Sequence, residues 1–551
     1  MLSLLSGVRE QSTIRLWDGF AWRRHVRSAA TSSIPLPVNS TMPRCLRLLP
    51  ALLLAAPLLA QTRTAPKPPA AIAAIRERDI KRDLYALAGD EMRGREAGTI
   101  DEMHASMWLA EEMRKIGLAP KGEMGSWFQW WNMRRTRIST TSSSVSIGGR
   151  KWTLWSDITP TTNAAIDVSG PTVFLANISD TTVDVRGKIV VVSLVPPDPA
   201  AIRSTTNTYE YNYTRPALTA VGIALSRRGA AGVIVVADSI AELAFDGVAR
   251  TQARGAYDVV NGAARFTRAP TPAAAAATAN AAAMASMPLL LAHRSALAGL
   301  RSNGQTADIR LRTEMFEYPS VNIIGEIRGT DAALRSEYVL FSSHQDHDGV
   351  RYTVNGDSIW NGADDNATTS VALLAIARAW KQHPSKRSAL FVFHGAEERG
   401  LLGSRYHVLH PVVPLASIVA VLNGDMLGRN SPDTAALLGS QPPHRNSAAL
   451  VQMAVDANLA TGRFVIDSLW DRPAHPEGWY FRSDHVPYAE RGVPSLFFSS
   501  NLHSDYHTPR DEPKNIDYGK LTRITRWMYM TGWLAANAAT RPAVDPGFVL
   551  R

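Results

Sequence analysis

The stretch VLFSSHQDHDGV, residues 339–350, places polar groups directly after an apolar run. Val339 to Phe341 have the character of a strand that is buried on both faces, because such strands are continuous apolar runs. In open α/β sheets the active site lies beyond the carboxyl ends of the strands. We therefore expect a functional site at this strand end, built from His344, Asp346, His347 and Asp348.

Four more segments repeat this arrangement. NGADDNATT (361–369) precedes a helical pattern, and HGAEERGLLGS (394–404), LNGDMLG (422–428) and SSNLHSDYHTPRDEP (499–513) end or follow apolar runs. From residue 316 onward, strand and helix patterns alternate. This indicates an α/β fold with a mixed, mostly parallel central sheet and helices on both faces. The segments would gather one set of side chains at one sheet edge: Asp364, Asp365, Glu397, Glu398, Asp425, His503, Asp505 and His507.

The chemistry of these side chains favours a divalent metal. Carboxylates mixed with imidazoles, without thiolates, suit Zn²⁺. One ion needs about three protein ligands, whereas two ions about 3.5–4 Å apart would use all five clusters. A single acidic cluster after a strand is usually a helix cap or a solvated turn; the joint occurrence is what points to metal. We expect Asp364 to be a cap or hydrogen-bond partner, and a structural or supporting role for His347, His394, His485 and His503.

The N-terminal region carries much of the net charge. The formal charge is +10, and residues 1–60 contain seven arginines against Glu10 and Asp18. The remainder is only mildly basic, so we do not expect nucleic-acid binding. Residues 42–61, MPRCLRLLPALLLAAPLLAQ, have the pattern of a secretory signal beginning at Met42 and cleaved before Gln61. We expect a periplasmic or secreted protein without stable membrane association after cleavage.

The chain divides into segments of different character. After an N-terminal extension and signal (1–60) and a linker (61–77), residues 78–135 are expected to form the N-terminal part of the main domain. Short β-branched strands dominate 136–315, which we interpret as a β-rich insert, and 316–540 forms the catalytic domain. Residues 72–116 are predicted to be helical, up to GLAP (117–120), and WFQWWNMRRTRIS (127–139) is predicted to form a strand. In the insert, residues 218–228 are predicted to form a helix, and residues 271–286 are a low-complexity stretch. The single cysteine, Cys45, lies in the signal, so disulfides and cysteine chemistry are excluded from the mature chain.

The motifs SSHQDH, NGADDNAT, HGAEERGLLGS, NGDMLG, RSDHVPYAERGVPSLFF and HSDYHTPRDEPKNIDY resemble, in this order, those of the M28 family of co-catalytic zinc peptidases. That family includes secreted bacterial aminopeptidases. The N-terminal GDEMRGREAGT extends the resemblance. DVRGKIVVVSLV and ALSRRGAAGVIVVADS, in the insert, are similar to strands of a protease-associated (PA) domain.

The resemblance implies a ligand set for two Zn²⁺ ions per chain. Asp365 resembles the bridging carboxylate. Glu398 and His507 resemble the other ligands of one zinc ion, and His344 and Asp425 those of the second.

The resemblance also implies catalytic roles. Glu397 resembles the general base, Asp346 the partner that orients His344, and Tyr506 an oxyanion-stabilising tyrosine. The family's Asp-Asp peptide is cis in some members, which would fit Asp364–Asp365.

These roles imply an exported exopeptidase, an aminopeptidase that hydrolyses peptides through a metal-bridging hydroxide. A glutamate-releasing carboxypeptidase is the alternative on the same fold, and a non-catalytic receptor module is the alternative from another class. A cyclase-like acyltransferase with one zinc is disfavoured by the second ligand set. Residues 467–485 are expected to line the specificity pocket, and their charges of both signs leave the choice between amino- and carboxypeptidase open. The expected partner is a peptide substrate, and the sequence does not indicate an oligomeric state.

Overall fold

The computed structural model describes residues 65–195, 209–262 and 287–550. These residues belong to one compact unit, Thr64–Arg551. The predicted signal, the N-terminal extension and the whole of the low-complexity stretch 271–286 lie outside the described residues. Among the residues described, no helix combines the length and the apolar character needed to cross a bilayer.

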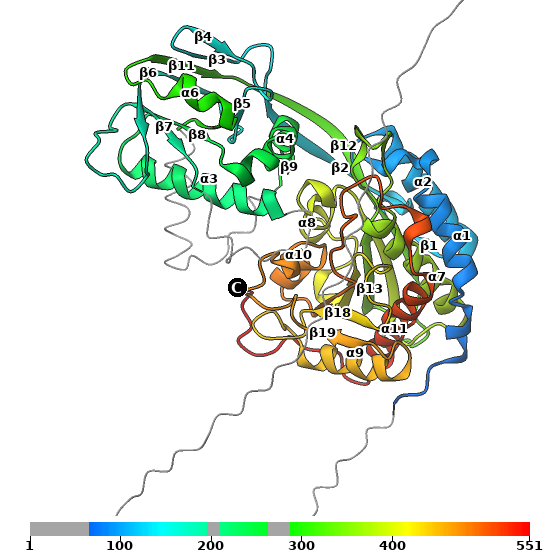
Figure 1. Cartoon of the computed structure of the whole chain (residues 1–551). Helices are drawn as coiled ribbons and strands as arrows, with labels where there is room; N and C mark the ends of the chain where they lie inside the picture. The colour runs from blue at the N-terminus through cyan, green and yellow to red at the C-terminus, as the bar shows by residue number, and fades with distance from the viewer. Residues whose placement is uncertain (1–64, 196–208, 263–286, 551) are drawn as a thin grey trace, which may run out of the picture. The chain divides into compact units, whose positions relative to one another are not determined.

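Four parallel strands form the centre of the first sheet (Figure 1). In spatial order they are β16 (Ser388–His394), β13 (Tyr338–His344), β17 (Ile418–Gly424) and β20 (Ser495–Ser499). Every residue of these strands is buried. The continuous apolar runs of the sequence therefore correspond to strands covered on both faces.

Two layers of helices cover this centre. Val339 and Phe341 of β13 pack into one hydrophobic cluster, whereas Leu340, between them, packs into another on the opposite face. This alternation follows from the two-residue period of a strand. The first cluster contains residues of α1 (Glu77–Leu87), α2 (Ile100–Ile116), α7 (Thr368–Gln382), α9 (Ala448–Ala460) and α11 (Tyr518–Asn537). The second contains residues of α8 (Leu402–Leu409) and α10 (His485–Glu490).

Antiparallel strands extend the first sheet on both sides. β12 (Thr313–Ile327) pairs with β16, with the short β1 (Ala119–Pro120) and with β2 (Phe128–Ile138), and β2 pairs with β9 (Ala256–Val259). On the other side, β18 (Thr434–Leu438) pairs antiparallel with β20 and parallel with β19 (Val465–Asp467). The sheet is mixed, as expected, but the expectation of a mostly parallel sheet holds for its centre only.

Residues 144–311 supply a second sheet of eight described strands, in the order β4-β3-β11-β6-β7-β8-β10-β5. Two helices, α3 (Tyr209–Arg227) and α4 (Ser239–Arg254), accompany it, and α6 (Leu297–Leu300) is a short one. The predicted helix 218–228 is the C-terminal part of α3, whereas α4 was not predicted. The strands are β3 (Ser144–Ile147), β4 (Arg150–Trp152), β5 (Ile158–Pro160), β6 (Ile166–Leu175), β7 (Ile189–Ser193), β8 (Gly232–Val236), β10 (Leu289–Ala292) and β11 (Thr306–Leu311).

The chain connects the two sheets through long strands. β2 and β12 pair over their whole shared length, from Phe128–Ile323 to Ile138–Thr313, and the chain enters the second sheet from β2 and leaves it into β12. β9 follows α4 directly and returns to the first sheet beside β2. The predicted segment 136–315 therefore contains one strand of the first sheet. A separate two-stranded ribbon, β14 (Gly349–Val354) with β15 (Asp357–Trp360), follows β13.

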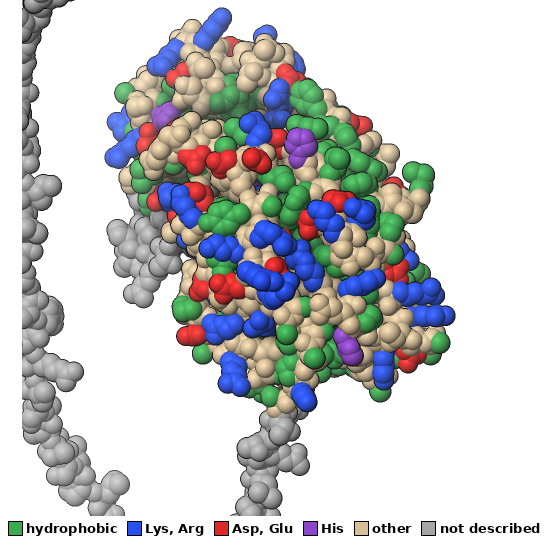
Figure 2. Space-filling model, turned by 90° about the vertical axis from the view of Figure 1, so that its right-hand side faces the viewer, with side chains coloured by type: hydrophobic (Ala, Val, Ile, Leu, Met, Phe, Trp, Pro, Cys, Tyr) green, Lys and Arg blue, Asp and Glu red, His purple; other side chains and the backbone are tan. Residues whose placement is uncertain are grey.

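The predicted N-terminal elements are present. Gly117 ends α2 with a φ of 90°, a left-handed conformation that favours glycine, and WFQWWNMRRTRIS forms β2. Figure 2 shows the face on the side where Figure 1 places α1 and α2: basic, acidic and hydrophobic side chains are interspersed on it. Several charges of α1 and α2 pair with sequence neighbours, such as Arg76 with Asp79 at the start of α1 and Arg114 with Glu111 in α2. Such exposed pairs are screened by water and contribute little to the stability of the fold.

Candidate metal centre

The parallel strands bring the predicted site residues to one edge of the first sheet. His344 is the last residue of β13, and Asp425 directly follows β17. Glu397 and Glu398 lie in a short 3-10 turn, Glu397–Arg399, just beyond β16. Because neighbouring parallel strands end at the same edge, their following residues meet there. Asp365, in the turn before α7, and His507, after β20, complete the site.

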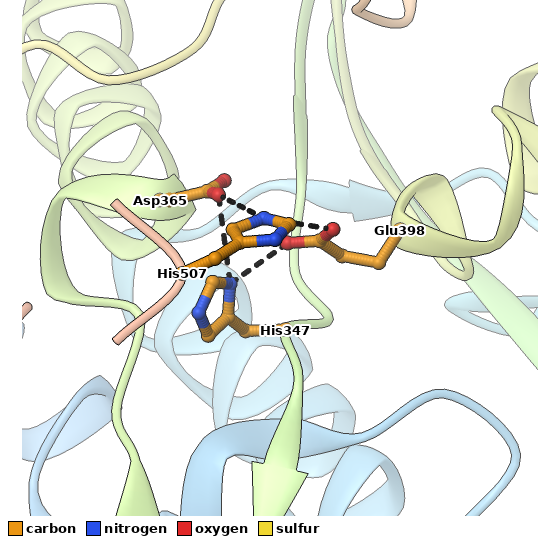
Figure 3. Close-up of side chains that lie close together, drawn as sticks. All are labelled: His347, Asp365, Glu398 and His507. Atoms are coloured by element: carbon orange, nitrogen blue, oxygen red, sulfur yellow. Dashed lines mark hydrogen bonds and ion pairs between the residues drawn. The ribbon is translucent and has the colours of Figure 1, made fainter. Parts of the chain in front are cut away.

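A first group of potential ligands consists of His347, Asp365, Glu398 and His507 (Figure 3). His507 Nε2 lies 3.0 Å from Asp365 Oδ2 and 3.1 Å from Glu398 Oε2. His347 Nδ1 lies 2.8 Å from Glu398 Oε1. These side chains come from separate segments, and their donor atoms converge on one point.

A second group consists of His344, Glu397 and Asp425. His344 Nε2 lies 3.5 Å from Asp425 Oδ2 and 3.8 Å from Glu397 Oε2. The two adjacent glutamates therefore belong to different groups, since Glu398 contacts His347 and His507 of the first group.

Asp365 lies between the groups. Its Oδ2 faces His507, whereas its Oδ1 lies 3.3 Å from His344 Nε2 of the second group. Its backbone N–H donates to Asp511, which fixes the turn. The cis peptide of this turn joins Asp365 to Asn366, so the expectation of a cis Asp364–Asp365 bond is wrong by one residue.

Asp346 supports both sides of the site. Its carboxylate accepts hydrogen bonds from the backbone N–H groups of Glu397, at 3.0 Å, and Glu398, at 3.3 Å. Its backbone carbonyl lies 3.1 Å from His344 Nδ1, whereas its carboxylate is 3.8 Å from that nitrogen. Asp346 was expected to orient His344 with its carboxylate; the closer contact is made by its carbonyl instead.

The contact with this carbonyl determines the tautomer of His344. A carbonyl oxygen only accepts, so Nδ1 carries the proton and donates to it. In the neutral ring Nε2 then presents a lone pair to Asp365 and Asp425. A lone pair facing buried carboxylates is repulsive unless a cation lies between them, and this is the usual tautomer of a metal-bound histidine.

The electrostatics of the site reflect its concentration of buried carboxylates. Burial alone would lower the pKa of His344, but Glu397 and Asp425 raise it well above its usual range. The pKa of Glu397 is raised well above its usual range by burial and by neighbouring carboxylates, and burial raises that of Asp425 to about 6. The side chains by themselves favour bound protons, which indicates that the site is built to receive positive charge.

The donor atoms fit divalent metal ions. Among the described residues, His344 Nε2, His347 Nδ1, Glu398 Oε1 and Asp425 Oδ1 are buried and make no hydrogen bond of good geometry. Buried polar atoms are normally paired. A set of imidazole nitrogens and carboxylate oxygens without thiolate suits Zn²⁺. The two groups together supply enough donors for two ions.

Tyr506 lies beside the first group. Its ring stacks on that of His507, with centroids 3.9 Å apart, and its hydroxyl accepts a hydrogen bond of 2.9 Å from Arg482. Arg482 also donates to Glu477 at 3.0 Å. The predicted pocket segment, 467–485, therefore contributes an arginine that contacts the tyrosine hydroxyl, a contact that no sequence pattern indicates.

Among the other histidines, His347 lies closest to the potential ligands. It was expected to be structural or supporting; its ring lies within the first group, with Nδ1 2.8 Å from Glu398 Oε1, and the supporting role stays a prediction. Its position three residues after His344, in the same strand-end motif, was the available signal. His394, His485 and His503 lie outside both groups. His503 Nε2 lies 3.4 Å from Asp364, which accepts a hydrogen bond from the backbone N–H of Gly428.

Comparisons with known proteins point to one family. Residues 322–531 match the model of peptidase family M28. Aminopeptidase YwaD of Bacillus subtilis is 30% identical over 167 residues, which cover 29% of this chain and 34% of that protein. Leucine aminopeptidase 2 of Trichophyton equinum is 26% identical over 261 residues, covering 42% and 48%. The chain thus spans between about a third and a half of the length of these relatives.

Solved structures share the fold. An aminopeptidase from Aneurinibacillus sp. strain AM-1 aligns with a TM-score of 0.53 at 15% identity, over 86% of this chain and 97% of that one. BSAP, a zinc aminopeptidase from Bacillus subtilis, aligns with a TM-score of 0.52 at 18% identity, over 88% and 100%. Both groups of potential ligands lie inside residues 322–531, the part of the chain that matches the model of peptidase family M28.

Proposed function

We propose that this protein is an exported, dinuclear zinc exopeptidase, and that it is an aminopeptidase that removes N-terminal residues from peptides. The observation that carries the proposal is the position of Asp365. Its two oxygens face different groups, Oδ1 toward His344 and Oδ2 toward His507. A carboxylate placed between two groups in this way could serve as a ligand to an ion in each of them.

The ligands divide around Asp365. Glu398 and His507 would hold one ion, and His344 and Asp425 the other, with Asp365 common to both. His347, 2.8 Å from Glu398 Oε1, would hold that carboxylate in place. Bound zinc ions would supply the positive charge that activates water and polarises a carbonyl.

Glu397 is proposed as the general base. It shares the second group with His344 but is not needed as a ligand there if Asp365 is shared. It takes a proton from the attacking water while the new C–O bond forms at the peptide carbonyl. It then delivers this proton to the amine nitrogen as the C–N bond breaks, so one water molecule is consumed for each bond cleaved.

Tyr506 and Arg482 are proposed to face the carbonyl oxygen of the substrate. The hydrogen bond from Arg482 holds the tyrosine oxygen beside the first group. A donor that is already fixed before the charge develops is the most effective kind.

A carboxypeptidase is the second candidate function, and one observation favours it. The cavity beside the first group is lined by several arginines, which would suit a substrate carboxylate. The names of the relatives favour the aminopeptidase. The proposed PA-like identity of the insert and the export of the protein rest on the sequence patterns described above.

The test is a comparison of free-end requirements. We expect hydrolysis of leucine p-nitroanilide, which has a free amine and no carboxylate, and no hydrolysis of its N-acetyl derivative. N-acetyl-Leu-Gly would be cleaved only by a carboxypeptidase. Hydrolysis of this peptide alone would replace the aminopeptidase assignment, and failure to hydrolyse any of the substrates with zinc present would refute the peptidase function.

A further inference from the structure

A cavity of about 780 Å³ lies beside the first group. Glu398 and His507 belong to its wall, so the cavity reaches the candidate metal centre. Basic side chains outnumber acidic ones among the charged residues that line it. These are Arg215, Arg250, Arg254, Arg351, Arg399 and Arg482, against Asp348, Glu398 and Glu477.

Two of these arginines come from α4. Arg250 and Arg254 are four residues apart, so they lie on the same face of the helix. Gly255 ends α4 with a φ of 89°, and a side chain there would begin 2.2 Å from the carbonyl oxygen of Thr136 in β2. The carbonyl of Arg254 accepts a hydrogen bond of 2.5 Å from Arg135, also in β2. The end of α4 is thus fixed against the first sheet.

Asp348 holds three guanidinium groups near the metal centre. Its carboxylate is 2.8 Å from Arg254 and 3.3 Å from Arg399, and it also pairs with Arg351. Glu96 adds a second carboxylate, 3.4 Å from Arg254 and 3.2 Å from Arg399. Three guanidinium groups therefore share two carboxylates, which leaves an excess of positive charge.

The remaining arginine of this cluster is placed by an aromatic contact. The guanidinium carbon of Arg250 lies 3.6 Å from the ring centre of Tyr352, and that of Arg351 lies 4.5 Å from the ring centre of Trp360. The described ion pair of Arg250 is a 3.6 Å contact with Asp246, whose side chain is 72% exposed. Such a pair is weak, so it competes little with a ligand.

We propose that the arginine cluster, Arg250, Arg254, Arg351 and Arg399, binds a carboxylate of the peptide substrate and makes the enzyme selective for acidic peptides. This inference rests on the proposed exopeptidase function. Guanidinium groups bind carboxylates through paired N–H donors, and a substrate anion would supply the charge that the cluster lacks.

The distance from the metal centre suits a short peptide. Asp348, at the centre of the cluster, lies 3.6 Å from His507 Nδ1 of the first group. Two extended residues span about 7 Å, so a substrate whose scissile carbonyl lies at the metal centre would bring its next groups to the arginines. The carboxylate is either the C-terminus of a short peptide or an aspartate or glutamate side chain beside the scissile bond.

The substrates for the test differ only in this carboxylate. Leu-Gly-amide has none, Leu-Gly has it at the C-terminus, and Leu-Asp-amide has it on a side chain. For the wild-type protein with zinc we expect kcat/KM for at least one acidic peptide to exceed that for Leu-Gly-amide by about 10-fold, as expected for a charge-assisted hydrogen bond in a partly exposed site. The preferred peptide identifies the source of the carboxylate.

The variants separate the cluster from general effects. In the double variant Arg250→Gln/Arg351→Gln, the ratio of kcat/KM for the acidic peptide to kcat/KM for the neutral peptide should fall close to one. Arg310→Gln, an exposed arginine of β11 in the second sheet, is the matched control and should leave the ratio unchanged. An unchanged ratio in the double variant, or no preference in the wild type, would overturn the inference. Thermal unfolding of each variant checks that it folds.

A binding measurement distinguishes this inference from the proposed function. Calorimetry with glutarate and with glutaramide, its diamide, requires no hydrolysis. We expect glutarate to bind at least about 10-fold more tightly, and the difference to disappear in the double variant. If glutarate binding depends on the arginines but no peptide is hydrolysed, the anion site is retained and the proposed peptidase function is refuted. If glutarate and glutaramide bind equally tightly, the anion site is refuted.

Discussion

The carboxylate of Asp346 accepts a hydrogen bond of 3.0 Å from the backbone N–H of Glu397. This bond joins the residues beyond β13 to the turn beyond β16. It fixes the proposed base from the backbone, not from the side chain, so the carboxylate of Glu397 remains available for proton transfer.

The substitution Asp346→Asn tests this arrangement. An asparagine keeps the shape, but its NH₂ group would face a backbone N–H donor, and a donor would be left unpaired in a buried position. We expect kcat to fall by roughly 10–100-fold, the usual effect of losing a partner that orients a metal site, together with a lower Tm. Asp433→Asn, an exposed aspartate, should change neither kcat nor Tm measurably. Near-wild-type kcat in Asp346→Asn would contradict the positioning role.

Glu397 and Glu398 are adjacent, chemically identical residues whose roles differ by prediction. Glu397→Gln removes the proton acceptor and should retain zinc while kcat falls by about 10²–10⁴-fold. Glu398→Gln removes an anionic ligand and should lower zinc content first, with activity partly restored by excess zinc. Zinc content and kcat, measured on both variants, decide the assignment. Loss of zinc in Glu397→Gln with retention in Glu398→Gln would exchange the two roles.

Metal content tests the shared position of Asp365. Purified protein should bind close to two zinc ions per chain, and a chelator should abolish hydrolysis reversibly. Asp365→Asn should weaken the binding of both ions, whereas His507→Ala should weaken mainly one, because only Asp365 faces both groups. Full activity with one ion per chain would exclude the dinuclear mechanism.

Glu102 predicts a pH dependence of stability. Burial, with a further contribution from Asp346, raises the pKa of this carboxyl to about 8. The folded state therefore holds a proton that the unfolded chain releases near pH 4, so this group makes stability fall as pH rises from about 4 to 8. Glu102→Gln should make the unfolding free energy depend less on pH between about 4 and 8. It should also raise the unfolding free energy at pH 8 by at least about 1 kcal/mol.

The control for this experiment uses the same substitution at an exposed site. Glutamine suits position 102 because its oxygen would accept the N–H of Gly98 and its NH₂ would donate to Ser320, the two partners of Glu102. Glu91→Gln, at an exposed position of the 3-10 turn Asp90–Arg95, should leave the profile unchanged. If the unfolding free energies of wild type and Glu102→Gln change with pH in the same way, the carboxyl of Glu102 is not protonated in the folded state.

Processing of the N-terminus is predicted from residues 42–61. N-terminal sequencing of exported protein should begin at or near Gln61, because the apolar run before it has the length and flanks of a cleaved signal. Residues 1–41 on the mature protein would contradict both the start and the cleavage predictions.

The central strands could be predicted because burial on both faces leaves a direct pattern. Val339 to Phe341 is a continuous apolar run, and the polar residues after it had to lie at the strand end. The same reasoning located Glu397 and Asp425, and the helical pattern after residue 367 located Asp365 in the turn before a helix. Strand direction at the sheet margins, as in β12 and β18, leaves no comparable pattern, since antiparallel and parallel pairing use similar residues.

Other features depend on contacts between distant residues. Arg254 meets Asp348 across 94 positions of the chain, and no local pattern indicates such a pairing. The inclusion of His347 in the first group depends on the direction of one side chain after the strand end. α4 was missed because the segment was interpreted from its short β-branched strands, although Asp238 is a suitable N-cap.

The return of β9 to the first sheet directly after α4 limits how separable the insert is. Deleting the residues between β2 and β12 would remove an edge strand together with two of the arginines. Grafting that segment from one relative onto another would transfer an edge of the catalytic sheet and part of the cavity wall in a single piece. Substrate preference and the folding of the sheet would then be inherited together, and a chimaera would have to match β9 to its host's β2 before its selectivity could change.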